Sequence, residues 1–150
     1  MNKYIVLDIN ETKTNDALNK AVCDVNFFAN QCGYKTLYIS KISKTSNFIF
    51  RVLRQLISIL SWIALFFKIK RKSILVIQAP FHREILGRRF ILKLCKHIKK
   101  VHLILFINDI MEIRNENCSK SDKDDFEFFI LNFEYFIAHN KKMVKYIKSK

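Results

Sequence analysis

Three apolar stretches of the sequence stop abruptly at side chains that can bind or deprotonate a polar molecule. The stretch 73–80 ends near Gln78 and is followed by His82, 101–107 is followed by Asn108 and Asp109, and 135–138 is followed by His139 and Asn140. Amides and imidazoles donate and accept hydrogen bonds, and a carboxylate can accept a proton during a reaction. These polar groups are candidate site residues, provided that the fold brings the three stretches together.

The elements around these residues alternate between two periodicities. Short runs rich in β-branched and aromatic residues predict strands at 4–9, 35–40, 73–80, 101–107 and 135–138. Between them, apolar residues spaced by three and four predict helices at about 18–32, which Gly33 ends, and at 48–69, 82–100, 121–132 and 141–150. This order predicts an α/β fold with a doubly wound parallel sheet of about five strands.

Parallel strands place their carboxyl ends at one edge of the sheet, which is where ligands bind in open α/β folds. We therefore expect the polar residues after the three stretches to share that edge. The alternative is that each residue only caps a helix or closes a turn, as amides and carboxylates commonly do.

Composition indicates one folded domain, 1–150, with 50% hydrophobic and 27% charged residues, and excludes a disordered tail. The formal charge of +14 points to an anionic partner such as a membrane or a nucleic acid. The positive charge is concentrated, since no acidic residue occurs between Asp24 and Glu84. Nucleic acid is disfavoured because the 14 Phe fall mostly at core-like positions rather than among the lysines.

Several ligand classes have no matching motif. The whole sequence has only two glycines, and neither the G-x-G-x-x-G nor the G-x-x-x-x-G-K-[ST] phosphate loop is present. No nucleotide cofactor is therefore expected in this chain. No metal is expected either, because Asp122, Asp124 and Asp125 lie at a predicted helix start, where they favour the helix dipole. The cysteines lack paired spacing and the amino-terminal apolar run is too short for a signal peptide, which predicts a cytoplasmic protein with reduced thiols.

The predicted helix 48–69 is unusually apolar. Its polar members fall on one narrow stripe: Arg51, Arg54, Gln55, Ser58, Ser61 and Lys68. The non-ionic run is about twelve residues, short of the roughly twenty that span a bilayer. Three interpretations remain: a helix in a core or subunit interface, a helix in the membrane interface with Trp62, Phe66 and Phe67 in the lipid, or a spanning helix.

The segments SILVIQAPFH, LILFINDIMEIRN and FIAHNKKMVKYI resemble the N-terminal half of GT-B-type sugar transferases. The similarity is to bacterial β-1,6-galactofuranosyltransferase-like proteins and adhesin-modifying glucosyltransferases. It implies a Rossmann-like acceptor-binding domain whose missing C-terminal partner domain would bind the nucleotide sugar. By this resemblance the chain is half of an enzyme, and we expect it to bind rather than catalyse.

The resemblance also implies roles for individual residues. Asp109 matches the family's aspartate and is the candidate catalytic base, whereas Asn108 stands where the family often has a histidine and cannot take a proton. Arg114 matches the family's arginine and could hold an anionic group of the acceptor. Acceptor-binding candidates are Gln78, His82, Asn108, Arg114, His139 and Asn140.

The expected partners follow from the same reading. They are a glycan or lipid-linked sugar acceptor, a separate C-terminal half or a second copy of the chain, and an anionic membrane surface on the inner face of the cell membrane. Two other functions stay open: a basic nucleic-acid-binding module, and a membrane-associated structural protein with no sugar site.

Overall fold

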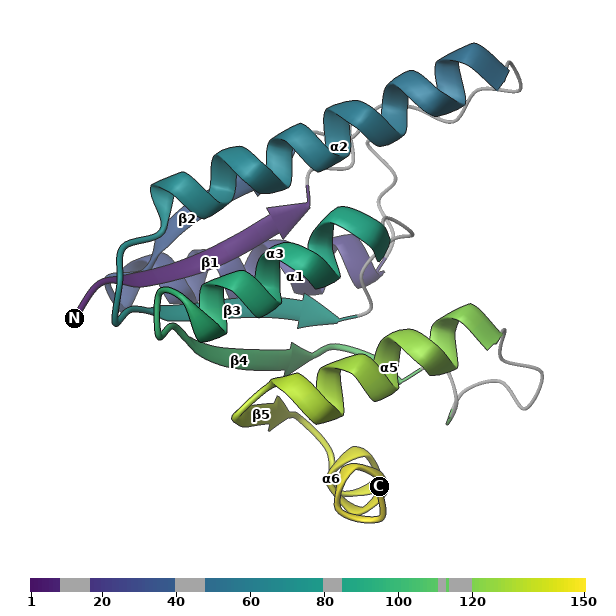
Figure 1. Cartoon of the computed structure of the whole chain (residues 1–150). Helices are drawn as coiled ribbons and strands as arrows, with labels where there is room; N and C mark the ends of the chain where they lie inside the picture. Colours follow the sequence, from purple (N-terminus) through teal and green to yellow (C-terminus); the bar gives the residue numbers. More distant parts are fainter. Residues whose placement is uncertain (9–16, 40–47, 80–84, 111–112, 114–119) are drawn as a thin grey trace.

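Five parallel strands form one sheet in the order β2-β1-β3-β4-β5 (Figure 1). The computed structural model describes residues 1–8, 17–39, 48–79, 85–110, 113 and 120–150. The strands are β1 (Lys3–Asp8), β2 (Lys35–Ile39), β3 (Ile74–Ala79), β4 (His102–Ile107) and β5 (Tyr135–Ala138). The helices are α1 (Ala17–Gln31), α2 (Phe48–Lys68), α3 (Ile85–His97), α5 (Lys120–Asn132) and α6 (Lys141–Lys148). The α/β prediction with a five-stranded parallel sheet is confirmed.

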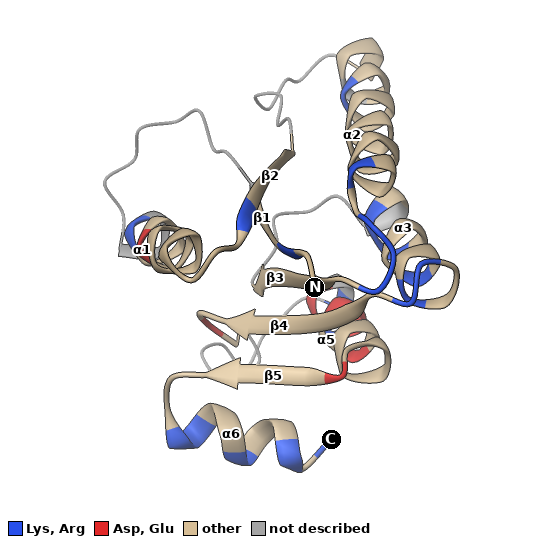
Figure 2. Cartoon of the chain, turned by 90° about the vertical axis from the view of Figure 1, so that its left-hand side faces the viewer, with Lys and Arg blue, Asp and Glu red and all other residues tan. Residues whose placement is uncertain are grey.

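The strand order decides which helix covers which face. The connection from β1 to β2 runs one way across the sheet, and the connections from β2 through β5 run the other way. Because such crossovers are right-handed, α1 must lie on one face and α2, α3 and α5 on the opposite face. Figure 2 shows this arrangement, with α6 beside the edge strand β5.

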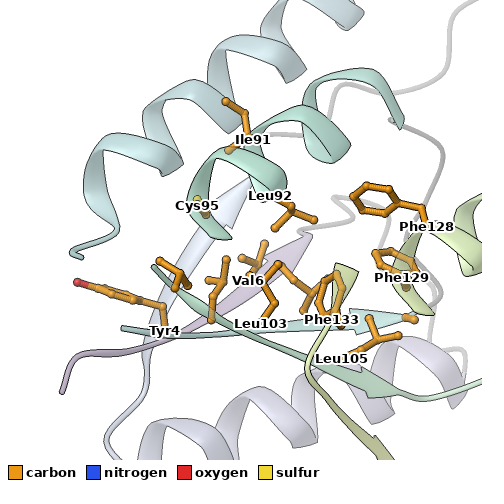
Figure 3. Packing of buried hydrophobic residues seen from close by; sticks show 14 of the residues in the cluster. Tyr4, Val6, Ile91, Leu92, Cys95, Leu103, Leu105, Phe128, Phe129 and Phe133 are labelled. Atoms are coloured by element: carbon orange, nitrogen blue, oxygen red, sulfur yellow. The ribbon is translucent and has the colours of Figure 1, made fainter. Parts of the chain in front are cut away.

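The main core lies between the sheet and the face that α2, α3 and α5 cover. Leu75 and Ile77 of β3 pair in register with Leu103 and Leu105 of β4, and all four are fully buried. Leu92 and Cys95 of α3, Phe128 and Phe129 of α5, and Phe133 directly after α5 pack over them (Figure 3). Burial of this apolar area is the main source of stability.

Helix α3 ties its neighbours together through two lysines. The Lys99 ammonium, just beyond α3, donates to the carbonyls of Phe66 and Ile69 at the end of α2. The Lys96 ammonium donates to the carbonyl of Asn132 at the end of α5, at 2.6 Å. The last carbonyls of a helix lack partners within it and carry partial negative charge, so both contacts stabilise the helix ends.

Arg88 of α3 is fully buried and pairs with Asp125 of α5, which Arg89 also approaches at 3.3 Å. The Arg88 guanidinium also lies 5.2 Å from the centre of the Phe129 ring. The sequence suggested that Asp125 favours the dipole at the start of α5. Instead, Asp125 belongs to the ion pair that joins α3 and α5.

Two helix ends are closed by residues with left-handed backbone. Gly33 has φ 81 after α1, as predicted from sequence, and the Tyr34 amide donates to the Ala29 carbonyl. Lys100 has φ 54 after α3, where the Val101 amide donates to the Cys95 carbonyl. This turn ends α3 at His97, three residues before the predicted end, because the chain leaves the helix to enter β4.

Helix α2 is long and apolar enough to cross a membrane by length and composition. Here it packs against the domain, because Trp62, Leu65 and Ile69 are buried in the core. It also approaches α3 closely at Gly87, where a Cβ atom would lie 3.2 Å from the Ile59 Cα. Of the three interpretations, the core helix describes Trp62, which is buried, so this residue does not form the lipid-facing side that the membrane-interface interpretation assigned to it.

Candidate functional site

Gln78 and Asn108 meet where β3 and β4 end. Ala79 pairs with Ile107, and the Asn108 amide donates to the Ala79 carbonyl at 2.8 Å, which extends the ladder by one residue. The Asn108 side-chain amide then donates to Gln78 Oε1 at 3.2 Å. The sheet thus brings together two of the residues that the sequence separates by a whole helix.

Gln78 is 4% exposed, and its amide is engaged on both sides. Gln78 Nε2 donates to the Val22 carbonyl of α1 at 3.3 Å, while Oε1 accepts from Asn108. Strand β3 adjoins β1, where the strand order reverses, and ligands of open α/β sheets bind outside this switch point. Gln78 therefore connects α1 to the polar edge and fixes the orientation of the half-buried Asn108.

Asp109 follows directly on the same edge and is partly exposed. The next residue, Ile110, is 2% exposed and belongs to the hydrophobic core. The backbone at Asp109 is held between the last ladder bond of Asn108 and the buried Ile110 side chain. A carboxylate anchored on both sides in this way is suited to a positioned role.

The end of β5 continues the edge. Ile107 pairs with Ala138, the last residue of β5. The residues that follow this pair, Asn108 and His139, are therefore neighbours at the edge, and the His139 side chain is exposed. Asn140 caps α6, because its side chain accepts the Met143 amide at 2.8 Å. The turn-and-cap alternative thus describes the contact that Asn140 makes.

A shallow depression of about 480 Å³ lies beside His139. It is lined by Ala138, His139, Asn140, Lys141, Val144, Lys145 and Lys148. The sequence reasoning missed the three lysines as site residues. The signal was their spacing of four and three, which places them on one face of α6. Their charge suits an anionic group on a ligand.

His82 and Arg114 lie outside the described residues, so their predicted place at this edge stays a prediction. Within the described ranges, no three His, Cys, Asp or Glu side chains gather as a metal site. Neighbouring parallel strands lie about 4.8 Å apart, so the edge from β3 to β5 is about 10 Å wide. Asn108, Asp109 and His139 border this span, and the buried Gln78 holds Asn108 through the hydrogen bond between their side chains.

A parallel doubly wound sheet with a polar carboxyl edge defines a Rossmann-like ligand-binding domain. Residues 3–150 match the family described as Glucosyltransferase 3-like, N-terminal domain, and the chain belongs to this family. It is therefore a glycosyltransferase N-terminal domain. The match runs from β1 to the end of the chain and includes every residue of the candidate edge. No curated protein matched the sequence.

Proposed function

We propose that this chain is the acceptor-binding half of a GT-B-type glycosyltransferase that transfers a hexosyl or galactofuranosyl unit to a glycan or lipid-linked sugar. The observation that carries the proposal is the family match over residues 3–150, which includes the polar edge. The sequence has no glycine-rich cradle for a pyrophosphate. We therefore assign the nucleotide sugar to a second domain, supplied by a partner chain or by an adjoining segment.

In the proposed reaction, a hydroxyl of the acceptor attacks the anomeric carbon of the donor sugar. The oxygen–carbon bond forms, the hydroxyl proton passes to the Asp109 carboxylate, and the nucleotide leaves with the electron pair of the broken glycosidic bond. Asp109 is the proposed base because it is the carboxylate that follows β4 on the polar edge. Asn108 cannot take a proton and would instead hydrogen-bond the acceptor.

The remaining residues would position the acceptor. Gln78 fixes Asn108, and His139 lies where a sugar hydroxyl could reach its ring. The lysines of the α6 depression would hold an anionic group of the acceptor, such as a phosphate of a lipid-linked sugar. His82 and Arg114 keep the acceptor-contact roles that the sequence suggested. A role in polysaccharide biosynthesis belongs to this proposal.

Ligand binding tests the proposal with the chain as it is. In saturation-transfer NMR, short glycans terminated by glucose, galactose or N-acetylglucosamine should receive magnetisation from the protein, and UDP-glucose should not. Asn108→Ala should weaken the glycan signal, whereas Lys123→Ala on the exposed surface of α5 should not. Binding of UDP-glucose without any glycan would place the donor here and overturn the assignment.

Turnover tests the base. When a donor-binding domain is supplied and transfer is observed, Asp109→Asn should lower kcat by at least about 10²-fold, the lower range for losing a positioned base. Glycan binding should persist, because the substitution keeps the size and hydrogen-bonding capacity of the side chain. An unchanged kcat would remove Asp109 from the chemistry, although the acceptor assignment would stand on the binding result.

A further inference from the structure

Helix α2 points an apolar face outward and packs the opposite side, which includes part of its polar stripe, against the domain. Gln55 and Lys68 of the stripe remain exposed. Ser58 is buried against the domain, and Arg54 has its Nε atom buried. These residues share one side of the helix with the core residues Trp62 and Leu65, and Ile69, directly after the helix, is also in the core. A surface helix of a soluble domain normally has the reverse orientation, with its apolar stripe toward the core.

The opposite side forms a continuous apolar ridge. It consists of exposed residues at spacings of three and four: Ile49, Val52, Leu53, Leu56, Leu60, Ile63 and Phe67. Ile49 and Phe67 at its two ends are 72% and 76% exposed. At 1.5 Å per residue the ridge is about 27 Å long. Monomeric soluble proteins rarely expose an apolar surface of this extent, and such surfaces mark sites of interaction.

The charge around the ridge is of one sign. Exposed Lys68, Lys70, Arg71, Lys72 and Lys100 form a basic cluster at the turns that follow α2 and α3, and Figure 2 shows the blue ribbon gathered there. The Lys72 amide donates to the Lys99 carbonyl at 2.8 Å, which holds the two turns together. Neither α2 nor α3 contains an acidic residue. A partner must therefore combine an apolar interior with negative charge.

We propose that the apolar ridge of α2 and the adjacent basic cluster bind the surface of an anionic lipid bilayer. The ridge would enter the boundary between head groups and acyl chains, and the basic cluster would contact lipid phosphates. This inference rests on α2 alone and is independent of the sugar-transfer proposal. The amino-terminal half of α2 projects past the carboxyl edge of the sheet (Figure 1), so binding would bring the candidate site near the lipid surface.

A second copy of the chain fits the surface less well. Two-stranded helix pairs in water carry charged residues beside their apolar seam, which set partner and orientation. The positions beside this ridge are themselves apolar, including Phe50, Ile57 and Ile59. Parallel pairing of two α2 helices would bring two basic clusters together, and no acidic residue on α2 would offset the repulsion in either orientation.

Tryptophan fluorescence tests where lipid contacts the protein. Because Trp62 is already buried, we expect its emission to stay constant when vesicles are added. Leu60→Trp places a reporter on the ridge, and Phe28→Trp places one on α1 across the sheet; the parent side chains are equally exposed, at 62% and 63%. With phosphatidylcholine vesicles containing phosphatidylglycerol, only the Leu60→Trp emission should shift to the blue. A shift of the α1 reporter alone would overturn the proposal.

Vesicle flotation measures the contributions of the two parts of the surface. Leu56→Gln with Leu60→Gln should weaken binding at least about tenfold by removing apolar burial, whereas Phe28→Gln should not. Lys70→Gln with Arg71→Gln should weaken binding roughly thirty-fold at low salt, since each surface charge contributes a several-fold gain near anionic lipid. Circular dichroism confirms that each variant is folded.

Two outcomes contradict the proposal directly. Equal binding to pure phosphatidylcholine, or no flotation with phosphatidylglycerol, would remove the anionic lipid surface as the partner. A blue shift of the Leu60→Trp emission that grows with protein concentration without vesicles, together with a doubled mass in light scattering, would assign the ridge to a second copy of the chain.

Discussion

Helices α2 and α3 lie side by side on the same face of the sheet, yet the more apolar one is the less buried. α3 contains two arginines, two lysines and a histidine in thirteen residues, but Leu92, Cys95 and even Arg88 are fully buried. α2 has one strongly apolar face, and that face is exposed. The difference follows from position, because α3 connects the adjacent strands β3 and β4, whereas α2 connects the edge strand β2 to β3. Burial is set by location over the sheet, and the surplus apolar surface of α2 needs another explanation.

The largest effect should come from the ion pair that lets a charged helix occupy the core. Asp125→Ala removes the carboxylate from the buried Arg88 guanidinium and should lower the free energy of unfolding by about 3–5 kcal/mol. Chemical denaturation measures the change. Arg88→Met combined with Asp125→Ala should recover most of the loss, because no buried cation then remains. If the single variant lost less than about 1 kcal/mol, burial of α3 would not depend on this pair.

The next effect depends on pH and concerns Cys95 of α3. Burial raises the pKa of this thiol to about 11, and the nearby Lys99 opposes the shift. The unfolded thiol loses its proton near pH 9 and the folded thiol only near 11, so the unfolded state binds fewer protons between these values. Stability should therefore fall by roughly 2–3 kcal/mol as pH rises through this window.

The substitution Cys95→Ala separates this effect from the titration of the lysines. The variant should be less stable at neutral pH, because it leaves a small cavity, but its stability should decline less between pH 9 and 11. Denaturation curves at several pH values provide the measurement. Parallel declines in the two proteins would show that the thiol does not titrate differently on folding.

A smaller effect should come from the contact between the two helices. Lys99→Met keeps the aliphatic chain but removes the ammonium from the Phe66 and Ile69 carbonyls, and should cost about 1–2 kcal/mol. Lys96→Met makes the same change at the end of α5 and is the matched variant. A smaller loss for Lys99→Met than for Lys96→Met would indicate that α2 is held mainly by its buried side chains.

Most of the fold could be predicted from sequence because the strands and helices have clear periodicity and the parallel order leaves few topologies. The Gly33 turn and the shared edge of β3, β4 and β5 followed from local rules. The Gln78–Asn108 hydrogen bond could not be predicted, because it depends on the register between strands. That register adds one ladder bond beyond the end of β4.

The orientation of α2 was also beyond sequence reasoning. A helix with a narrow polar stripe is expected to turn that stripe to water and the rest of its circumference to apolar surroundings. The packing of α3 at Gly87 and the burial of Ser58 reverse this choice. Likewise, the sequence alone places Asp125 at a helix start, because its partners, Arg88 and Arg89, are distant in sequence.

The smallest expected effect on stability concerns the ridge of α2 and tests the contrast between its two faces. Leu60→Gln should change the free energy of unfolding by no more than about 0.5 kcal/mol, because its side chain is largely exposed. Leu65→Ala, one and a half turns away on the buried face, should cost about 2–5 kcal/mol. Denaturation at low protein concentration measures both. A loss above about 2 kcal/mol for Leu60→Gln would mean that other protein atoms already cover the ridge when the protein is in aqueous solution. The ridge could then bind lipid only after releasing the part that covers it.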